Sequence, residues 1–166
     1  GYANTSGTEN AFMGLSVGQS NTTGNYNTAI GGRYALDRNT TGSSNTAVGY
    51  SALYANTTGS QNTAAGAQTL TNNTTGTQNV ALGFFALTTN TTANNNTAVG
   101  YQSLYLNTTG ANNTAVGMNA LVVNTTGHSN VAVGHLAFDA NTTGYQNVAV
   151  GRHALGSNTT ANLNTA

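Results

Sequence analysis

Residues 39–55 read NTTGSSNTAVGYSALYA, and residues 56–72 repeat the same pattern as NTTGSQNTAAGAQTLTN. Successive repeats lie 17 residues apart, except for one step of 18 that an extra residue in 31–33 produces. A chain this periodic is a single tandem-repeat array over residues 1–166, without linker or domain boundary. The tetrad Asn-Thr-Thr-Gly, or a close variant of it, begins at Asn4, Asn21, Asn39, Asn56, Asn73, Asn90, Asn107, Asn124, Asn141 and Asn158.

The length and composition of the repeat indicate a β-solenoid. Seventeen residues are too few for a helix-turn-helix repeat, which needs about 34, and Asn, Thr and Gly all have low helix propensity. One repeat therefore predicts one coil, and each coil pairs with the next at the strand spacing of about 4.8 Å. The expected fold is all-β, a parallel β-solenoid (β-roll) of about ten coils.

One short segment of each repeat alternates in the manner of a strand. In 45–49 (NTAVG) and 130–134 (NVAVG), period-2 alternation places Thr or Val and the next Val on one face, and Ala on the other. We expect the Thr/Val and Val pair to point inward. The glycine that ends the segment suits a turn with positive φ or a close backbone approach. A second apolar row, expected at the next corner, comprises Leu36, Leu53, Leu70, Leu87, Leu104, Leu121, Phe138 and Leu155.

Two asparagines recur in every repeat, one opening the tetrad and one leading the strand segment. Because equivalent residues stack one coil apart, we expect their amides to form hydrogen-bonded ladders along the axis. The ladder residues of the tetrad are Asn21, Asn39, Asn56, Asn73, Asn107, Asn124 and Asn141. Those that lead the strand are Asn27, Asn45, Asn62, Asn79, Asn96, Asn113, Asn130 and Asn147.

The alanine row of the strand segments is kept small, and Phe12 is its one large member. A face open to solvent would drift toward polar residues, so a small row indicates a surface in close contact. Either another molecule packs on it, or the opposite wall of a thin coil does. We favour the first, a self-association strip of Ala47, Ala64, Ala81, Ala98, Ala115, Ala132 and Ala149. A formal net charge of zero permits close lateral association.

The composition excludes several classes of function. Only 4% of the residues are charged, and the cations are three Arg, which excludes a phosphate-tracking nucleic-acid binder and a polybasic membrane-surface binder. No apolar run approaches the roughly 20 residues of a membrane-spanning helix, and there is no Cys. The three acids, Glu9, Asp37 and Asp139, are too far apart in sequence to pair for acid–base catalysis. We expect no enzyme, no catalytic residue and no cofactor.

Three other patterns resemble sites, and for each we prefer a structural explanation. His135 and His153 fall one column apart in adjacent coils, but a pair is fewer than the three or four ligands of a zinc site, so we expect no metal. Each tetrad is formally a glycosylation sequon, yet glycans about 4.8 Å apart would clash and would use up the ladder amides. The aromatic-rich column after the strand glycine, which we expect to be exposed or at an interface, contains Tyr50, Ala67, Phe84, Tyr101, Met118, His135 and Arg152.

The segments 45–53, 96–104 and 113–121, with NTAVG followed by Ala-Leu or Ser-Leu, resemble the SVAIG repeat in the heads of YadA-like trimeric autotransporter adhesins. They are also similar to tandem repeats of phage tail fibres and other bacterial surface fibres. The resemblance covers essentially the whole chain, although the adhesin heads use shorter units. It implies a left-handed parallel β-roll in a homotrimeric, extracellular, rod-like part.

The favoured function is therefore a structural subunit of an extracellular bacterial or phage fibre, at the cell surface or in a virion appendage. Its expected partner is another copy of itself, in a trimer or a helical filament. The alternative is an adhesin or receptor-binding module whose exposed aromatic and Thr columns recognise a glycan or a cell-surface receptor. A minor alternative is ice binding by a flat Thr array, although Thr46 alternates here with Val48.

Overall fold

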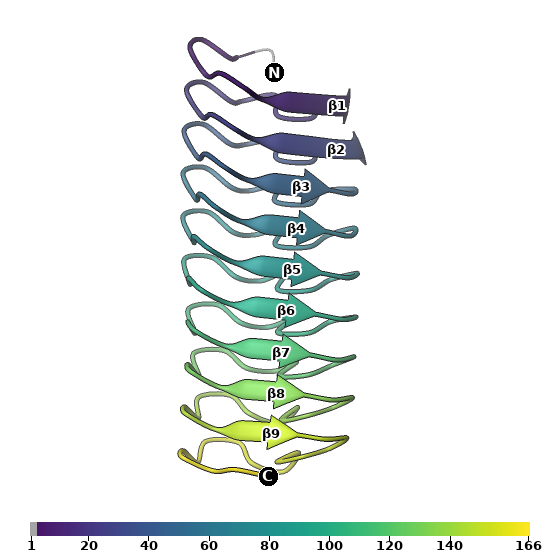
Figure 1. The fold of residues 1–166 in the computed structure, drawn as a ribbon, viewed down its shortest axis with the longest axis vertical. Coiled ribbons are helices and arrows are strands. Elements are labelled where there is room, and N and C mark those ends of the chain that lie inside the picture. The colour runs from purple at the N-terminus through teal and green to yellow at the C-terminus, as the bar shows by residue number, and fades with distance from the viewer. Residues whose placement is uncertain (1–2) are drawn as a thin grey trace.

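The computed structural model describes residues 3–166 as a stack of coils with a nine-stranded parallel sheet along one wall (Figure 1). The strands follow one another in the sheet in chain order. The predicted all-β solenoid is confirmed. Its strands are β1 (Ala11–Leu15), β2 (Thr28–Arg33), β3 (Thr46–Val48), β4 (Thr63–Ala65), β5 (Val80–Leu82), β6 (Thr97–Val99), β7 (Thr114–Val116), β8 (Val131–Val133) and β9 (Val148–Val150).

Equivalent positions of successive repeats stack directly on one another, so that Ala47 pairs with Ala64 and Ala64 with Ala81. Because of the extra residue in 31–33, the paired residues Thr28 and Thr46 are 18 and not 17 residues apart in sequence. The same residue shifts the register at the end of the β1–β2 ladder. A Cβ built on Gly32 would meet nothing within 4 Å. The insertion is therefore absorbed at one strand end, as in a β-bulge, and the next coil keeps its register.

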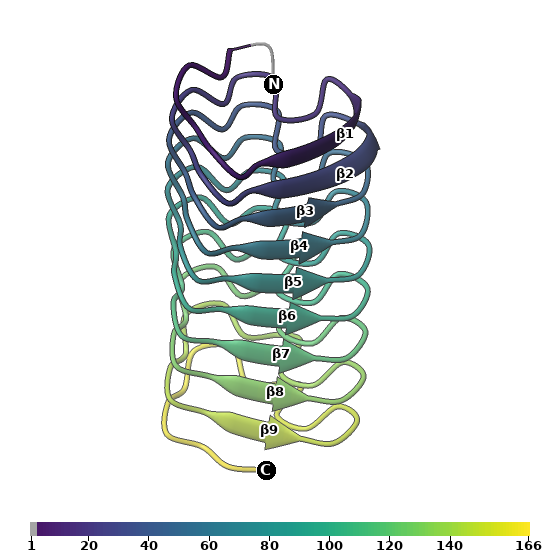
Figure 2. The same cartoon turned by 45° about the horizontal axis from the view of Figure 1, so that its top comes forward.

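The remaining walls of the tube are irregular segments that follow the same path in each coil (Figure 2). Within residues 3–166 no helix has the length and apolar character that crossing a bilayer requires.

The inward and outward sides of the strands are the reverse of our expectation. Ala47, Ala98 and Ala132 are fully buried, whereas Val48 and Val133 are exposed. The interior is thin, and the space beside the alanine row is filled by the buried row Leu36, Leu53, Leu70, Leu87, Leu104, Leu121 and Phe138. Only a methyl group fits between the sheet and that row, so the larger strand residues face outward.

The first coil shows how the two inner rows share this space. Phe12 replaces the alanine of the other coils, and Gly18 replaces the leucine. A Cβ built on Gly18 would lie 2.7 Å from the Phe12 ring, so the ring occupies the space beside that corner. A large residue in one row thus requires a small one in the other, and the interior holds one bulky side chain per coil.

The coils of β2 to β9 each turn at three left-handed corners that are not glycine. In the coil of β6 these corners are Asn95 (φ 60), Gln102 (φ 52) and Leu104 (φ 51). A left-handed L-residue costs roughly 1–2 kcal/mol. Each corner N–H donates to a carbonyl of a neighbouring coil: Asn95 to Thr77, Gln102 to Phe84 and Leu104 to Ala120. These bonds, together with full burial of Leu104, offset the strain.

The strand glycines other than Gly31 take the positive φ that we predicted. Gly49 has φ 129, and a Cβ built on it would lie 2.7 Å from the carbonyl oxygen of Gly66 in the next coil. Both the positive φ and the close approach are confirmed.

Exchanging the sizes of two facing core residues tests the shared interior. We expect Ala98→Phe alone to lower the free energy of unfolding by about 1–3 kcal/mol through overpacking, and Leu104→Gly alone to lower it by about 2–5 kcal/mol through a cavity. The double variant has the same two residues as the first coil, Phe and Gly. Its free energy of unfolding should be at least about 1 kcal/mol higher than the value obtained by adding the losses of the two single variants. Urea unfolding followed by circular dichroism measures all three, and simple additivity would contradict the facing rows.

Candidate functional surfaces

Two asparagine columns tie each coil to the next, and their members from Asn21 to Asn147 are fully buried. In the tetrad column, the Nδ2 of Asn107 donates to the Oδ1 of Asn90 (3.1 Å) and to the carbonyl of Gly110 (2.9 Å). In the strand-leading column, the Oδ1 of Asn96 accepts the backbone N–H of Asn113 (2.9 Å) and its Nδ2 (3.2 Å). The predicted ladders are confirmed.

The two ladders converge on one carbonyl per coil, which the sequence did not suggest. The carbonyl of Gly110 accepts the Nδ2 of Asn107 from its own coil and the Nδ2 of Asn96 from the preceding coil, both at 2.9 Å. The same node recurs at Gly59, which Asn56 and Asn45 contact. The tetrad glycine is therefore the point where the two columns and two successive coils are joined.

These bonds also explain the sequons. The tetrad asparagines from Asn21 to Asn141 are fully buried, and the Nδ2 of each donates to the Oδ1 of the preceding tetrad asparagine in the stack. A glycan on that nitrogen would replace one of its two N–H donors and would have no route to solvent. The second threonine of the tetrad is exposed in each of these coils, at Thr23, Thr41, Thr58, Thr75, Thr92, Thr109, Thr126 and Thr143.

The alanine strip is not a surface. Ala47, Ala64, Ala81, Ala98, Ala115, Ala132 and Ala149 are all fully buried in the interior of the tube. The self-association strip was therefore wrong, and the opposite wall of the thin coil is the partner that keeps these positions small. The side chains that the strands present to the outside are their neighbours at the Thr/Val and Val positions.

Aromatic rings gather along the edge where the strands end. Tyr50 is 49% exposed and packs against Tyr34 at 6.4 Å between ring centroids, and Tyr34 packs on Tyr54 at 5.8 Å. The guanidinium groups of Arg33 and Arg38 lie over the rings of Tyr34 and Tyr54, at 4.5 and 4.6 Å.

A second aromatic group, formed by Phe84, Phe85, Tyr101 and Tyr105, lies along the same edge. Sequence reasoning found Tyr50, Phe84 and Tyr101 but missed Phe85 and Tyr105. A 20-residue spacing, shared by Phe85 with Tyr105 and by Tyr34 with Tyr54, is the pattern that could have found the contacts.

The histidines lie where the repeat predicts. The rings of His135 and His153, on adjacent coils, are 6.0 Å apart, and His128 stacks on Tyr145 at 5.0 Å. In the part of the chain that the structure describes, no three His, Cys, Asp or Glu side chains come together to hold a metal ion.

Comparison of the chain with protein-family models, with curated proteins and with solved structures finds no match. Function is therefore inferred from the residues and surfaces of the chain itself.

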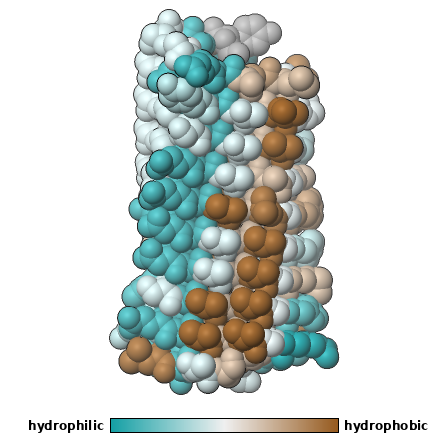
Figure 3. Space-filling view, in the orientation of Figure 1, coloured by the Kyte–Doolittle hydropathy of each residue, from teal (hydrophilic) through white to brown (hydrophobic). Residues whose placement is uncertain are grey.

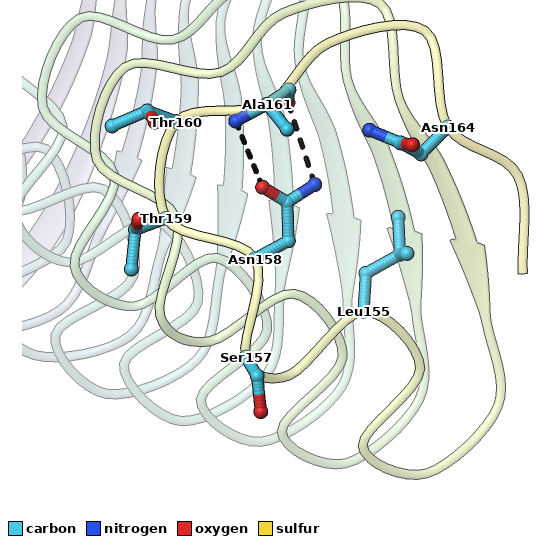
Figure 4. A pocket seen from close by; sticks show the side chains of 7 residues that line it. All are labelled: Leu155, Ser157, Asn158, Thr159, Thr160, Ala161 and Asn164. Atoms are coloured by element: carbon cyan, nitrogen blue, oxygen red, sulfur yellow. Dashed lines mark hydrogen bonds between the residues drawn. The ribbon is translucent and has the colours of Figure 1, made fainter.

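A hollow of about 380 Å³ lies at the last coil, lined by Leu155, Ser157, Asn158, Thr159, Thr160, Ala161 and Asn164 (Figure 4). Asn158 closes its turn through Ala161, with the Nδ2 donating at 3.4 Å and the Oδ1 accepting at 2.9 Å. Asn158, Leu155 and Asn164 belong to the columns that contact the following coil elsewhere in the stack. The lining is therefore that of a coil–coil contact, and the hydroxyls of Ser157, Thr159 and Thr160 have no histidine or carboxylate among the lining residues.

Asp37 has a buried Oδ1 without a hydrogen-bond partner. Desolvation raises the pKa of Asp37 above its ordinary value of 3.8, against the opposing effects of the Arg38 charge and of a backbone hydrogen bond from Gln19. The folded chain thus binds this proton more tightly than the unfolded chain does, so Asp37 makes the fold less stable as the pH rises from 3.8 through the raised pKa.

We expect Asp37→Asn to melt at a higher temperature than the unsubstituted chain at pH 7, because the amide carries no charge to desolvate. The difference should shrink as the pH falls toward 3.8. Thermal unfolding across this range measures it. A difference that stays constant with pH would contradict the role of the Asp37 charge.

The ladder has a matched test within one coil. Asn96→Asp keeps the Oδ1 acceptor but places an oxygen against the Gly110 carbonyl, so we expect a loss of about 3 kcal/mol or more in the free energy of unfolding. Asn95→Asp, at the adjacent exposed position, makes the same chemical change and should cost less than about 0.5 kcal/mol. Urea unfolding compares them, and equal losses would contradict the ladder.

Proposed function

We propose that this chain is a structural subunit of an extracellular fibre of a bacterial cell or a phage, a rod that supplies length and durability. One observation carries the proposal: each coil is bonded to the next in the same register, through the strand ladder and the two asparagine columns. In such a stack, length grows with the number of repeats while the cross-section stays constant.

The placement of side chains supports the same function. The inner rows and ladders devote the buried positions of the repeat to cohesion between coils, and the polar part of this cohesion comes from neutral amides and hydroxyls instead of charges. Ladders of neutral groups are insensitive to salt, which suits a rod outside the cell. The resemblance of the NTAVG segment to adhesin and tail-fibre repeats supports an exterior location and association between copies of the chain.

Electron microscopy of engineered arrays tests the rod. A chain in which residues 39–157, seven whole repeats, are duplicated in frame should form rods of unchanged width that are longer by about 4.8 Å per added repeat. Compact particles that widen as repeats are added would overturn the proposal. For location, immunogold labelling of intact cells or particles that carry the chain should place gold along surface fibres, and label confined to the cell interior would contradict it.

The exposed aromatic edge supports a second candidate, recognition of a glycan or a receptor by the rod. Tyr50 presents an open ring beside Tyr34 and Arg33, and aromatic faces stack on sugars. A glycan array probed with the unsubstituted chain and with Tyr50→Ala tests this candidate. Binding that Tyr50→Ala abolishes supports it, whereas an array without binding removes it.

A further inference from the structure

The outward face of the sheet exposes columns of large apolar side chains. Figure 3 shows hydrophobic side chains in columns along this wall, beside a hydrophilic wall. We call it the outer sheet face and define it by the outward residues of β2 to β9 together with the column after the strand glycine. Val48 and Leu82 are 39% and 37% exposed, and Tyr101 in the adjoining column is 45% exposed.

The outer sheet face is almost free of charge. Its only Asp, Glu, Lys, Arg or His side chains are Arg33, His135 and Arg152, so the coils of β3 to β7 present Thr, Val, Leu, Ala, Tyr, Phe and Met on this face. Glu9, Asp37 and Asp139 belong to other columns of the repeat. Nothing on this face therefore opposes contact with a second uncharged surface.

The face is large enough for a specific interface. It extends about 40 Å along the axis at about 4.8 Å per strand, and about 13 Å across at about 3.3 Å per residue. Its flat area of about 500 Å² is comparable to the largest apolar patch of a typical monomeric protein, which is often a contact site. Two such faces together bury about 1,000 Å², the size at which specific interfaces begin.

The spacing of the face determines the kind of partner. Its side chains form ridges that repeat once per coil, because equivalent residues stack in register from β3 to β9. A partner whose ridges fit these grooves along the whole length must have the same repeat, and a second copy of this solenoid has it.

We propose that the outer sheet face is the lateral contact surface between two copies of this chain. This deepens the proposed fibre function, on which it rests, by assigning self-association to the Val and aromatic columns. Ala65 and Ala67 leave a notch in these columns at β4, between the larger side chains of the coils of β3 and β5. A neighbouring copy can seat a bulky residue there, which favours one register of the pair.

Charge placed on the face tests the assignment. Val99 and Val116 point outward from β6 and β7, and Thr92 and Thr109 are exposed residues of the tetrads of the same two coils. We expect the unsubstituted chain to associate in a concentration-dependent way in sedimentation velocity, and V99K/V116K to remain monomeric with an unchanged circular dichroism spectrum. The matched control T92K/T109K carries the same added charge and should associate as the unsubstituted chain does.

Spin labels locate the contact independently. The chain has no Cys, so Val99→Cys and Thr92→Cys each introduce a single labelling site in one coil. Double electron–electron resonance should give a shorter distance between copies for the label at 99 than for the label at 92. Three results would overturn the assignment. They are a shorter distance for the label at 92 than for the label at 99, association of V99K/V116K, and an equal loss of association in the two lysine variants.

The outcomes also separate this proposal from the fibre function. An unsubstituted chain that stays monomeric at high concentration, while duplicated arrays still form single rods, overturns the lateral contact and leaves the rod intact. A monomer that instead sediments with phosphatidylcholine vesicles assigns the face to lipid and likewise overturns it. Arrays that do not lengthen into rods contradict the fibre whether or not copies associate.

Discussion

The structure depends on one constraint: each polar group that points along the axis needs a hydrogen-bond partner in an adjacent coil. The asparagine amides satisfy it with little cost, because one side chain both donates and accepts. The convergence of Asn96 and Asn107 on the carbonyl of Gly110 binds three parts of two coils at once. A change in one repeat therefore disturbs its neighbours as well, and this accounts for the uniformity of the buried positions.

The thin interior follows from the same constraint. A short coil encloses room for a methyl group and one larger side chain, and its corners are tight enough to need left-handed backbone. Leucine at such a corner, as at Leu104, is costly in isolation. Here its side chain fills the tube and its N–H bonds to the next coil, so the strained corner is also the main source of core packing.

Much of this architecture could be predicted from the repeat alone. Period and composition give the stacked coil, and stacking makes an Asn column a ladder. Alternation, however, divides a strand into two faces without indicating which one lies inside. We expected the larger residues to lie inside, and the structure places them outside. The deciding quantity is the width of the interior. The sequence of the first coil indicates that this width is small, because Phe12 stands there in place of Ala and Gly18 in place of Leu. The aromatic contacts at a 20-residue spacing escaped because they join different columns of adjacent coils.

Burying the small residues has a consequence for function. A soluble domain usually places its valines inside, and this coil cannot, so it exposes Val48, Val133 and their equivalents in a column. Stability along the axis comes from amides and hydroxyls, and the apolar side chains are left for contacts across it. Variation is concentrated accordingly: the ladder and core positions hardly change from coil to coil, whereas the column of Tyr50, Phe84 and Met118 does. A partner that distinguishes one segment of the rod from another must therefore contact the variable side chains on the lateral surface of the rod.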